Sequence, residues 1–550
     1  MIPTIPTPAE LETLLCEACG ITPEEKNDFL YPEYTLGDPF LFFDMNKAVA
    51  RIHDAIQNGE RIGIYSDYDC DGIPGAVVLR DFFILLGKGD LVDVYIPDRH
   101  DEGYGISIQG LDALSEKGVT LMITVDVGIT ALAEVADAQS RGIDVIVTDH
   151  HEPLATFPAA YAVIHPARSD YPCKALCGAG VAFALVRAFL HAHGKEFGVK
   201  EGAEKWLLDL VGFATLSDMV PLVGENRVLA SYGLTVMRSA GWRARRIGLS
   251  TLFMVNYLSP ERVTESDLTF TVAPRLNAAS RMASPMLAFD LLATNDEARA
   301  HALVSELEKI NNERKLLVAR IVKDAHARLA HRDLPDLVVI GDLTWRPAVL
   351  GLVATKLQET YGRSFFVWGG NGGDVLKGSC RMRDEHHAAL LFQALPEGTL
   401  VNSGGHQAAG GFSVTKEKVH FLEAALNDAL AGVDHEADES DTMRALPLPL
   451  AIATTRHYEV VRKFAPFGVA NHEPTFLFEN VSVQSTKKFG KTKEHLECVV
   501  SDATGEATAF TFFADDEVTS AMSSGEPVSF TATLEAGWKG GVRLRIKDVL

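Results

Sequence analysis

Short apolar runs alternate with longer helical patterns between residues 46 and 165. Each run has the length of a buried strand, and the segments between the runs repeat their apolar residues at helical spacing. This alternation of strands and helices predicts a parallel α/β sheet. The predicted strands are 62–65, 91–96, 120–125, 144–148 and 161–164.

Polar residues directly follow three of these strands. Asp67, Asp69 and Asp71 follow the first one. Asp126 follows the third, and the triplet Asp149-His150-His151 follows the fourth. Because the carboxyl ends of parallel strands meet at one edge of a sheet, we expect these side chains to lie together. Three carboxylates within five residues repel one another unless a cation lies between them, which favours a metal site over a decorated turn.

The pattern after this sheet is mostly helical. Residues 175–285 contain a buried helix at 206–216, and Asp218 follows its end. Residues 294–334 contain neither Gly nor Pro and keep helical apolar spacing. They predict one long helix of about 50 Å between two lobes, and the spacing allows a capping box beginning at Thr294.

The last third of the chain contains three successive sequence patterns. A second α/β unit precedes an acidic linker, and a region rich in β-formers with regular turn signals follows, typical of a small barrel or sandwich. We therefore expect an α/β protein with two lobes joined by a long helix, followed by a β domain. The expected segments are a helical lead-in (1–45), the first lobe (46–285), the connecting helix (286–334), the second lobe (335–432), the linker (433–447) and the β domain (448–550).

Composition and charge restrict the partners. The 550-residue chain has 74 acidic and 51 basic residues, a formal net charge of −23, so a polyanion must bind at a local basic groove. The N-terminus is not signal-like and no apolar run could span a bilayer, so we expect a cytoplasmic protein without a membrane partner. The seven cysteines do not describe a disulfide framework. The basic stretch Trp242–Arg246 is interpreted as a solvated helix face.

The acids and one histidine together suggest a metal centre. Carboxylates with one or two imidazoles suit Mn²⁺ or Mg²⁺ better than zinc. So many acids indicate two divalent cations, an arrangement that serves in-line attack of an activated water on phosphorus. The candidate ligands are Asp67, Asp69, Asp71, Asp126, His150 and Asp218.

Five motifs resemble those of the DHH phosphoesterase superfamily with its DHHA1 domain: DYDCDG at 67–72, VDVG at 125–128, DHH at 149–151, SDMVPL at 217–222 and GGH at 404–406. Within that superfamily the chain resembles the RecJ family of single-strand-specific 5′→3′ DNA exonucleases, and the similarity covers almost everything after residue 45. The narrower motifs are PDRHDEGYG at 97–105, PRLNAASRM at 274–282, GSCR at 378–381 and PFGVANHEPTF at 466–476.

This resemblance implies a catalytic role for four residues. Asp126 would bridge two cations, His150 would be a ligand, and His151 would face the scissile phosphate. His406, delivered by a glycine-rich loop, would stabilise charge on the phosphoryl oxygens. Glycines in such a loop let the backbone approach a phosphate closely.

The resemblance also implies where DNA binds, with an oligonucleotide-binding (OB) barrel as the C-terminal domain. A pocket for the 5′-terminal phosphate would contain Arg99, Ser379 and Arg381, since arginine forks match phosphate geometry. The remaining strand contacts would be Arg275, Asn277, Arg281, Ser403, Gly404, Gly405, Trp538, Lys487 and Lys488.

Two other functions remain open at this point. One is a DHH-family phosphodiesterase that hydrolyses short oligoribonucleotides or cyclic dinucleotides, against which the extended barrel argues. The other is a noncatalytic replication scaffold, against which the intact acids and histidines argue. For the exonuclease, the resemblance implies single-stranded DNA, the single-strand DNA-binding protein and a RecQ-type helicase as partners.

Overall fold

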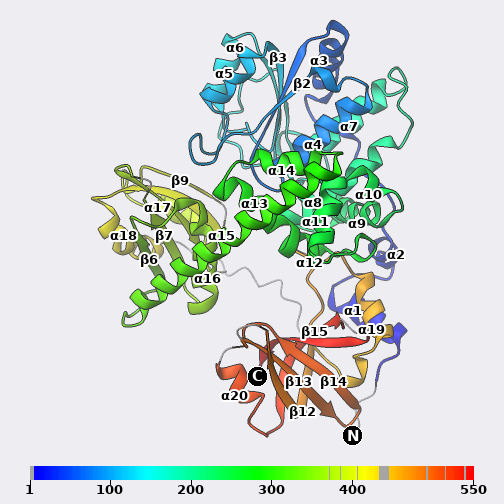
Figure 1. Ribbon diagram of the computed structural model, residues 1–550, viewed down its shortest axis with the longest axis vertical. Helices are drawn as coiled ribbons and strands as arrows, with labels where there is room; N and C mark the ends of the chain where they lie inside the picture. Colours follow the sequence, from blue (N-terminus) through cyan, green and yellow to red (C-terminus); the bar gives the residue numbers. More distant parts are fainter. Residues whose placement is uncertain are drawn as a thin grey trace.

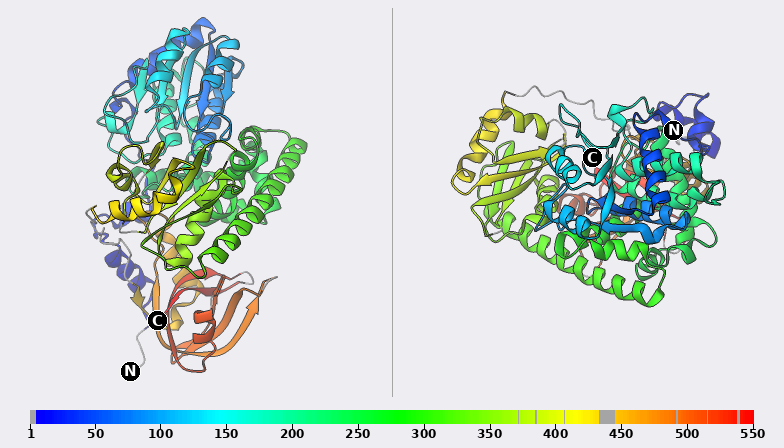
Figure 2. Two further views of the ribbon diagram at one scale, coloured as in Figure 1. Left: turned by 90° about the vertical axis from the view of Figure 1, so that its left-hand side faces the viewer. Right: turned by 90° about the horizontal axis from the view of Figure 1, so that it is seen from above.

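The protein consists of two α/β lobes, a long helix that joins them, and a β-barrel (Figure 1, Figure 2). The fold class expected from the sequence is confirmed. His406 and Trp538 lie outside the described residues. The computed structural model describes residues 5–370, 372–383, 386–405, 407–432, 445–490, 493–514, 516–537 and 540–550.

The first lobe is built on a five-stranded sheet of order β2-β1-β3-β4-β5, in which every pairing is parallel. Ser66 at the end of β1 lies opposite Val125 at the end of β3. The residues that follow, Asp67 and Asp126, therefore leave the sheet side by side. The strands are β1 (Arg61–Ser66), β2 (Val92–Tyr95), β3 (Val119–Val125), β4 (Asp144–Thr148) and β5 (Ala162–Ile164).

Helices cover both faces of this sheet. Helices α3, α4 and α7 share the largest apolar core with α8, and α5 and α6 cover the opposite face. Helix α4 is buried along most of its length, which explains why its apolar residues occupy every side. The helices are α3 (Met45–Asn58), α4 (Gly72–Leu85), α5 (Ile108–Glu116), α6 (Leu132–Ser140), α7 (Gly178–His193), α8 (Leu208–Ser217), α9 (Gly224–Arg238), α10 (Trp242–Arg245), α11 (Ile247–Val255), α12 (Glu265–Asp267), α13 (Ala273–Met282), α14 (Met286–Ala293) and α15 (Glu297–Leu329).

The long helix expected between the lobes is α15. Its N-cap is Asp296, whose carboxylate accepts a hydrogen bond from the backbone N–H of Arg299 at 2.6 Å. The capping box expected at Thr294 is wrong, because that hydroxyl instead accepts from the backbone N–H of Asp296. Leu307 packs in the core of the first lobe and Ile321 in a core of the second. One continuous element therefore contributes to both lobes.

The second lobe has a mixed five-stranded sheet of order β6-β7-β8-β10-β9. In the described part of this lobe only β6 and β7 pair in parallel, and the glycine-rich strands β9 and β10 form an antiparallel edge. The elements are β6 (Leu337–Asp342), α16 (Leu350–Tyr361), β7 (Ser364–Gly369), β8 (Val375–Arg381), α17 (Ala388–Ala394), β9 (Asn402–Gly405), β10 (Ala409–Thr415) and α18 (Leu422–Leu430).

The C-terminal β domain is a closed barrel. Its strands follow the order β12-β13-β14-β16-β15, and a pairing of β12 with β15 closes the ring. The barrel expected from the family resemblance is therefore present. The elements are β11 (Leu446–Pro447), α19 (Thr455–Lys463), β12 (Phe476–Phe489), β13 (His495–Asp502), β14 (Gly505–Thr511), α20 (Asp516–Ala521), β15 (Val528–Ala536) and β16 (Val542–Val549).

The N-terminal helix α1 (Pro8–Ala18) lies beside the barrel, and α2 (Lys26–Leu30) lies next to α9 of the first lobe (Figure 1). Leu11 and Leu15 are fully buried in the same core as the barrel strands and α19. Arg227 of α9 is 3% exposed and donates hydrogen bonds to backbone carbonyls of Phe29 and Ala465. The lead-in segment and the barrel are thus held together against the first lobe.

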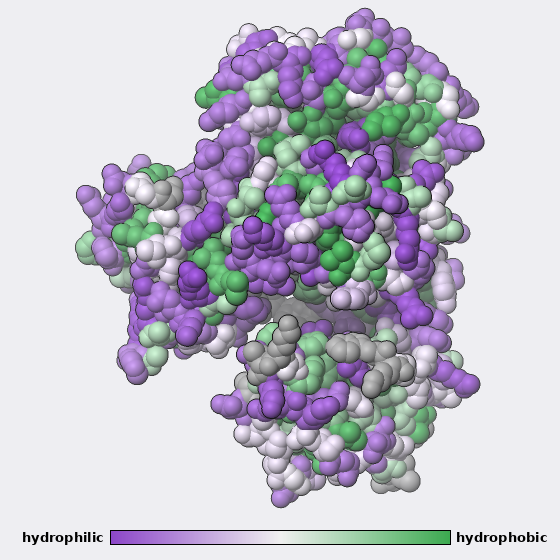
Figure 3. Space-filling model, in the orientation of Figure 1, coloured by the Kyte–Doolittle hydropathy of each residue, from purple (hydrophilic) through white to green (hydrophobic). Residues whose placement is uncertain are grey.

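Figure 3 shows hydrophilic side chains over most of the face that it views, with hydrophobic residues scattered in small groups.

Among the described residues, none of the helices combines the length and the apolar character that crossing a bilayer requires.

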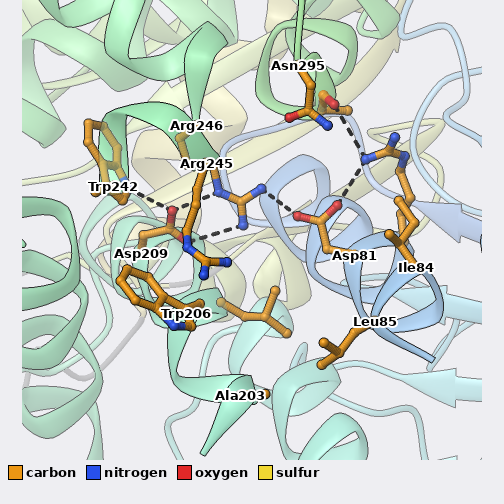
Figure 4. A pocket seen from close by; sticks show the side chains of 13 residues that line it. Asp81, Ile84, Leu85, Ala203, Trp206, Asp209, Trp242, Arg245, Arg246 and Asn295 are labelled. Atoms are coloured by element: carbon orange, nitrogen blue, oxygen red, sulfur yellow. Dashed lines mark hydrogen bonds and ion pairs between the residues drawn. The ribbon is translucent and has the colours of Figure 1, made fainter. Parts of the chain in front are cut away.

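The basic segment Trp242–Arg246 is a solvated helix face only in its middle, since Arg243 and Arg245 are exposed while the two ends are buried. Arg246 is 6% exposed and forms ion pairs with Asp209 and Asp81 (Figure 4). The buried indole of Trp242 donates to Asp209 at 2.8 Å. The two ends of the segment therefore face inward, while Arg243 remains exposed. The carboxylates responsible lie far away in the sequence, so the local pattern could not reveal this arrangement.

Replacing Arg246 with alanine is expected to lower the free energy of unfolding by about 3–5 kcal/mol, because the buried carboxylate of Asp209 loses its ion-pair partner and Asp81 keeps only its pair with Arg80. Urea denaturation of the variant measures this loss. Arg243→Ala is the matched control, since its ion pair with Glu261 is about 60% exposed on both sides and such pairs contribute roughly 1 kcal/mol or less. Equal losses in the two variants would contradict the buried network.

Candidate active site

The loops at the carboxyl ends of β1, β3 and β4 bring the predicted acids and histidines to one place. Nε2 of His150 lies 3.1 Å from Asp126 Oδ1, and 3.7 Å from both Asp71 Oδ2 and Asp218 Oδ2. Asp218 is the C-cap of α8, which packs against α4 and α7. A residue distant in sequence thus completes the cluster that the strand ends begin.

The potential ligand atoms form groups small enough to surround single ions. One group consists of Asp67, Asp69 and Asp126, and another of Asp71, His150 and Asp218. Within each group the ligand atoms all lie within 4.8 Å of one another. Because Asp126 belongs to the first group and contacts His150 of the second, it lies where the two groups meet.

Asp71 is held by the beginning of α7. Its two carboxylate oxygens accept hydrogen bonds from the backbone N–H groups of Gly178 at 2.6 Å and Ala179 at 2.8 Å. The N-terminus of a helix favours a negative charge in this position. A Cβ atom at Gly178 would lie 2.5 Å from the Cβ of Asp126, so only glycine allows the helix to approach this closely.

Asp126 has a φ of +62°, an unusual backbone conformation for a residue other than glycine. Its backbone N–H donates to the carbonyl of Thr148 at 3.0 Å, which continues the sheet pairing one residue beyond β3. Strained backbone of this kind persists where surrounding structure determines it, and it is concentrated at functional sites. Here it accompanies the side chain at the centre of the cluster.

Burial and mutual repulsion raise the pKa values of the clustered carboxyl groups. Burial, then the charge of Asp69, raises the pKa of Asp71 to about 6. Burial, then the charge of Asp71, raises the pKa of Asp218 to about 9. Burial, then the charge of Asp69, raises the pKa of Asp67. Burial, then the charge of Asp71, raises the pKa of Asp126. A site with these properties favours the binding of positive charge.

The donor set fits divalent cations. Asp67 Oδ1 is buried and has no hydrogen-bond partner among the described residues, as expected of an atom that serves as a metal ligand. Oxygen donors predominate, and His150 supplies a nitrogen, a combination suited to Mn²⁺ or Mg²⁺. The residues present can therefore hold the two ions that the sequence predicts.

His151 is oriented by residues that the sequence analysis did not include among the site residues. Its Nδ1 lies 2.9 Å from Asp149 Oδ1 and 3.2 Å from the hydroxyl of Tyr104. Burial by itself lowers the pKa of His151, but the hydrogen bond to Asp149 and the charges of Asp149, Asp67 and Asp218 together raise that pKa to about 9. Tyr104 lies within the PDRHDEGYG motif, so this motif was the signal that could have identified it.

Several predicted DNA contacts form a cationic group beside the metal cluster. The guanidinium of Arg99 lies 4.9 Å from the ring centroid of Tyr68. Burial, then the nearby charges of Arg99 and Arg314, lowers the pKa of Arg281 to about 9. Arg281 also donates to the carbonyl of Ala348 at 3.0 Å, which connects α13 with the second lobe. These arginines repel one another and favour an anion between them.

The other members of the predicted phosphate pocket lie on the second lobe. Ser379 and Arg381 belong to β8, and Arg381 Nε donates to the hydroxyl of Thr355 on α16 at 3.0 Å. Among the described residues, no hydrogen bond or ion pair joins either residue to Arg99. Arg275 behaves differently from the others, because its guanidinium is already paired with Glu308.

Unpartnered polar atoms lie where α13 faces α15. Asn277 Oδ1, both amide atoms of Asn311 and Nε of Arg314 are buried without a hydrogen-bond partner among the described residues. Buried polar groups are normally satisfied, so these atoms indicate a polar ligand. Asn311 and Arg314 were missed from the sequence because they lie on a long helix that otherwise has an ordinary amphipathic pattern.

The remaining predicted contacts lie on exposed edges. Ser403, Gly404 and Gly405 belong to the exposed edge strand β9, directly before His406. Lys487 and Lys488 are exposed on β12, opposite Glu497 and Leu496 of β13.

Beside these lysines lie aromatic side chains that the sequence analysis did not single out as exposed. Phe512 and Phe513 are 36% and 74% exposed, and His495 packs against both rings. Phe476, Phe478 and Phe510 are instead core residues. The alternation of inward-facing and outward-facing residues along a strand could have indicated which aromatic residues lie in the core. It could not have indicated which of the remaining aromatic residues are exposed.

Comparison with known proteins places this geometry in a family. Residues 61–215 match the DHH family, N-terminal domain, residues 315–432 the DHHA1 domain, and residues 445–548 the RecJ OB domain. The single-stranded-DNA-specific exonuclease RecJ of Haemophilus influenzae is 30% identical over 483 residues, which cover 85% of this chain and 83% of the relative. The chain belongs to the RecJ family.

Other RecJ proteins extend this similarity. The single-stranded-DNA-specific exonuclease RecJ of Escherichia coli is 31% identical over 78% of this chain and 77% of its own length. The RecJ of Bacillus subtilis is 34% identical over 85% of this chain, but this chain spans only 58% of that relative's length.

Solved RecJ structures have the same fold. The crystal structure of RecJ from Thermus thermophilus in complex with Mn²⁺ has a TM-score of 0.78 and 26% identity, covering all of this chain and 78% of the other. A structure of the exonuclease RecJ bound to manganese has a TM-score of 0.60 and 31% identity, covering 72% of this chain and 97% of the other.

The raised pKa values predict how pH affects the metal-free protein. Carboxyl groups whose pKa is higher in the folded state than in the unfolded state make the folded protein bind extra protons, so stability falls as pH rises above about 4. The contribution of His151 has the same sign, since it is complete below about pH 6.5 and disappears as pH rises through about 9.

Mn²⁺ relieves this repulsion, so the increase in Tm that it causes in chelator-treated protein is expected to be larger at pH 8 than at pH 6. Differential scanning fluorimetry measures both shifts. The double variant Asp67→Asn/Asp218→Asn should show a smaller pH dependence without metal. An equal Mn²⁺ shift at both pH values in the unaltered protein would contradict the assignment.

Proposed function

We propose that this protein is a metal-dependent exonuclease that hydrolyses single-stranded DNA from the 5′ end to mononucleotides. The observation that carries the proposal is the convergence of Asp71, Asp126 and Asp218 within 3.1–3.7 Å of one imidazole nitrogen of His150. RecJ relatives named as single-stranded-DNA-specific exonucleases, and RecJ structures solved with Mn²⁺ or Mg²⁺, support the substrate and the cofactors.

Two divalent cations, Mn²⁺ or Mg²⁺, would be held by the two groups of ligands described above. When bound, such ions supply Lewis acidity to the phosphodiester and activate a water for in-line attack. The protein's own contribution is to hold six ligand side chains in place before the substrate arrives. The N–H groups at the start of α7 do this for Asp71, and the sheet does it for Asp126.

His151 is assigned to the scissile phosphate. Its hydrogen bond to Asp149 fixes the orientation of the ring, and this bond together with the surrounding carboxylate charges favours the protonated ring at neutral pH. The protonated ring also carries an Nε2–H donor, which we assign to a phosphoryl oxygen whose negative charge grows during the reaction. His406 is proposed to act on the same oxygens from the second lobe.

The arginines and asparagines at the lobe junction are proposed to hold the strand. Arg281 and Arg314 contribute charge, while Asn277 and Asn311 supply the unpartnered polar atoms described above. Arg99, Ser379 and Arg381 are proposed to bind the 5′-terminal phosphate. A phosphate between Arg99 on one lobe and Arg381 on the other would join the two groups and define the end from which hydrolysis begins.

The barrel is proposed to bind the strand beyond the active site. Exposed rings of Phe512 and Phe513 offer stacking faces for bases, and the exposed Lys487 and Lys488 add positive charge. Trp538, which lies outside the described residues, is proposed as a further DNA contact from the resemblance alone. An extended surface of this kind serves a long strand. It has no evident use for a short oligoribonucleotide or a cyclic dinucleotide, which keeps that alternative in second place. The single-strand DNA-binding protein and a RecQ-type helicase as partners, and a cytoplasmic location, are proposed from the resemblance alone.

Digestion of an internally labelled single strand tests the reaction and its polarity. With Mn²⁺ or Mg²⁺, blocking the 5′ end is expected to stop hydrolysis, whereas blocking the 3′ end leaves it unchanged. Asp126→Asn should reduce the rate by at least about 100-fold, because the residue at the centre of the cluster loses its charge. Asp170→Asn, at an exposed aspartate of the same lobe, is the matched control.

If the single strand is not degraded but dinucleotides are hydrolysed, the proposed substrate is contradicted, whereas the assignment of the metal site still stands. Retained activity in Asp126→Asn would contradict the site itself. If the 5′-phosphate pocket is correct, Arg99→Ala should also abolish the preference for a 5′-phosphate over a 5′-hydroxyl end.

The barrel surface predicts a separable binding defect. Phe513→Ala is expected to weaken single-strand binding by about 1–3 kcal/mol without changing its salt dependence, because the variant removes a stacking face but no charge. Lys487→Ala/Lys488→Ala should instead lower the slope of log affinity against log salt by roughly 0.7 for each phosphate that is no longer neutralised. Fluorescence anisotropy measures both effects. Phe421→Ala is the control, since this ring is 72% exposed on the second lobe; an equal defect there would contradict the assignment.

A further inference from the structure

Glu102 lies in the loop that joins β2 to α5, residues 96–107, and its carboxylate accepts three hydrogen bonds. Oε1 accepts from the backbone N–H of Asp98 at 2.7 Å. Oε2 accepts from the hydroxyl of Tyr95 at 2.9 Å and from the hydroxyl of Ser107. Tyr95 ends β2 and Ser107 is the N-cap of α5, so one side chain connects both ends of the loop with its interior.

The two hydroxyl donors are themselves held by the sheet and by α5. The ring of Tyr95 stacks on that of Tyr65 in β1, with centroids 5.4 Å apart and planes inclined by 28°. The hydroxyl of Ser107 accepts from the backbone N–H of Gly110 at 2.9 Å, as expected of a helix N-cap. The backbone N–H of Ser107 donates to the hydroxyl of Tyr65 at 2.9 Å. Glu102 therefore attaches the loop to rigid elements.

The loop needs this attachment because of its glycines. Gly103 has a φ of +85° and Gly105 a φ of +108°, conformations that side chains other than glycine rarely adopt. Glycines on both sides of Tyr104 give the backbone there more freedom to rotate, so contacts made by side chains must fix it. Glu102 directly precedes the first of these glycines and supplies such contacts.

Arg99 lies in a turn that Glu102 closes. The backbone N–H groups of Glu102 and Gly103 donate to the carbonyl of Asp98 at 2.9 and 3.2 Å. Because the Glu102 carboxylate also accepts from the N–H of Asp98, these two residues bond each other in both directions. This reciprocal arrangement fixes the backbone that carries Arg99, whose guanidinium lies against the ring of Tyr68.

Tyr104 lies on the other side of Glu102. Its hydroxyl lies 3.2 Å from Nδ1 of His151, the histidine assigned to the scissile phosphate. The loop thus carries one side chain assigned to the 5′-terminal phosphate and one that orients a catalytic group. On the basis of the function proposed above, we propose that Glu102 is a positioning residue for both. Binding of the 5′-phosphate by Arg99 and orientation of His151 would then depend on the same carboxylate.

The effect of Glu102 must pass through the loop. The groups of metal-ligating side chains in the active site do not include this residue among those described. Its contribution is therefore the placement of Arg99 and Tyr104, and not charge on a cation. A displacement of about 1 Å in a positioning contact can slow a reaction by about 100-fold, so the loss of this carboxylate should be measurable.

Hydrolysis of 5′-phosphorylated and 5′-hydroxyl single strands tests this role. The unaltered protein is expected to prefer the phosphorylated end. Glu102→Ala should reduce this preference, measured as the ratio of kcat/KM values, by at least about 10-fold and lower kcat on both strands. Asp101→Asn, at an exposed carboxylate of the same loop, is the matched control and should change neither. Glu102→Gln should recover much of the preference, because its amide occupies the same space and can bond the same partners.

Tyr95→Phe keeps the test decisive if Glu102→Ala folds poorly, because it removes one hydroxyl and retains the stacked ring. It should lower the preference in the same direction by a smaller factor. Arg99→Ala/Glu102→Ala should show the same preference as Arg99→Ala, since both changes disrupt one contact.

Three results would overturn the proposed role of Glu102. One is an unchanged preference in both Glu102→Ala and Tyr95→Phe, and another is a further loss of preference in the double variant. The third is an unaltered protein that hydrolyses 5′ ends without preferring a phosphate, which would leave the exonuclease activity in place. If the unaltered protein does not hydrolyse strands from the 5′ end, the proposed function is overturned together with this role.

Discussion

Repulsion among buried carboxylates is the constraint on which the first lobe depends. Asp67, Asp71 and Asp126 are almost fully buried within one cluster, where neighbouring negative charges raise their pKa values. Such a cluster is unfavourable by itself, and the fold compensates it in two ways. Backbone N–H groups at the start of α7 bind Asp71, and the geometry leaves oxygen atoms directed toward space that a cation can occupy.

The apolar helices explain how the lobe can hold this cluster in place. Helices α4, α7 and α8 are buried along most of their lengths, so their positions are set by close packing and not by the charges. Gly178 and Gly75 permit the closest approaches, since a Cβ at Gly75 would lie 2.5 Å from a methyl group of Val125. The packing of many apolar side chains therefore offsets the unfavourable free energy of the few clustered carboxylates. The same packing holds the backbone of Asp126 in its strained conformation.

The sequence predicted the parts of the fold that depend on local pattern. Asp67, Asp126 and His150 mark strand ends, and the structure brings them together as the topology of a parallel sheet predicts. What the sequence could not reveal depends on distant partners. Nothing near Arg246 indicates the carboxylates that bury it, and nothing near Asn311 indicates that it faces α13 without a partner among the described residues.

Contacts between the lobes and exact helix ends were also beyond local reasoning. Arg99 and Arg381 were grouped by resemblance, but in the structure each contacts a residue of its own lobe, Tyr68 and Thr355 respectively. The choice of Asp296 over Thr294 as a helix cap depends on a shift of two residues, which spacing alone does not resolve.

The position of α1 has a consequence for synthesis of the chain. Its buried leucines belong to the barrel core, yet the strands that cover them come several hundred residues later. At ribosomal rates of about 5–20 residues per second, this amphipathic helix waits for tens of seconds without its partners. Meanwhile the first lobe, whose contacts are complete much earlier, can fold. The barrel therefore assembles last and draws both ends of the described chain together, so the order of translation and the order of folding differ for this segment.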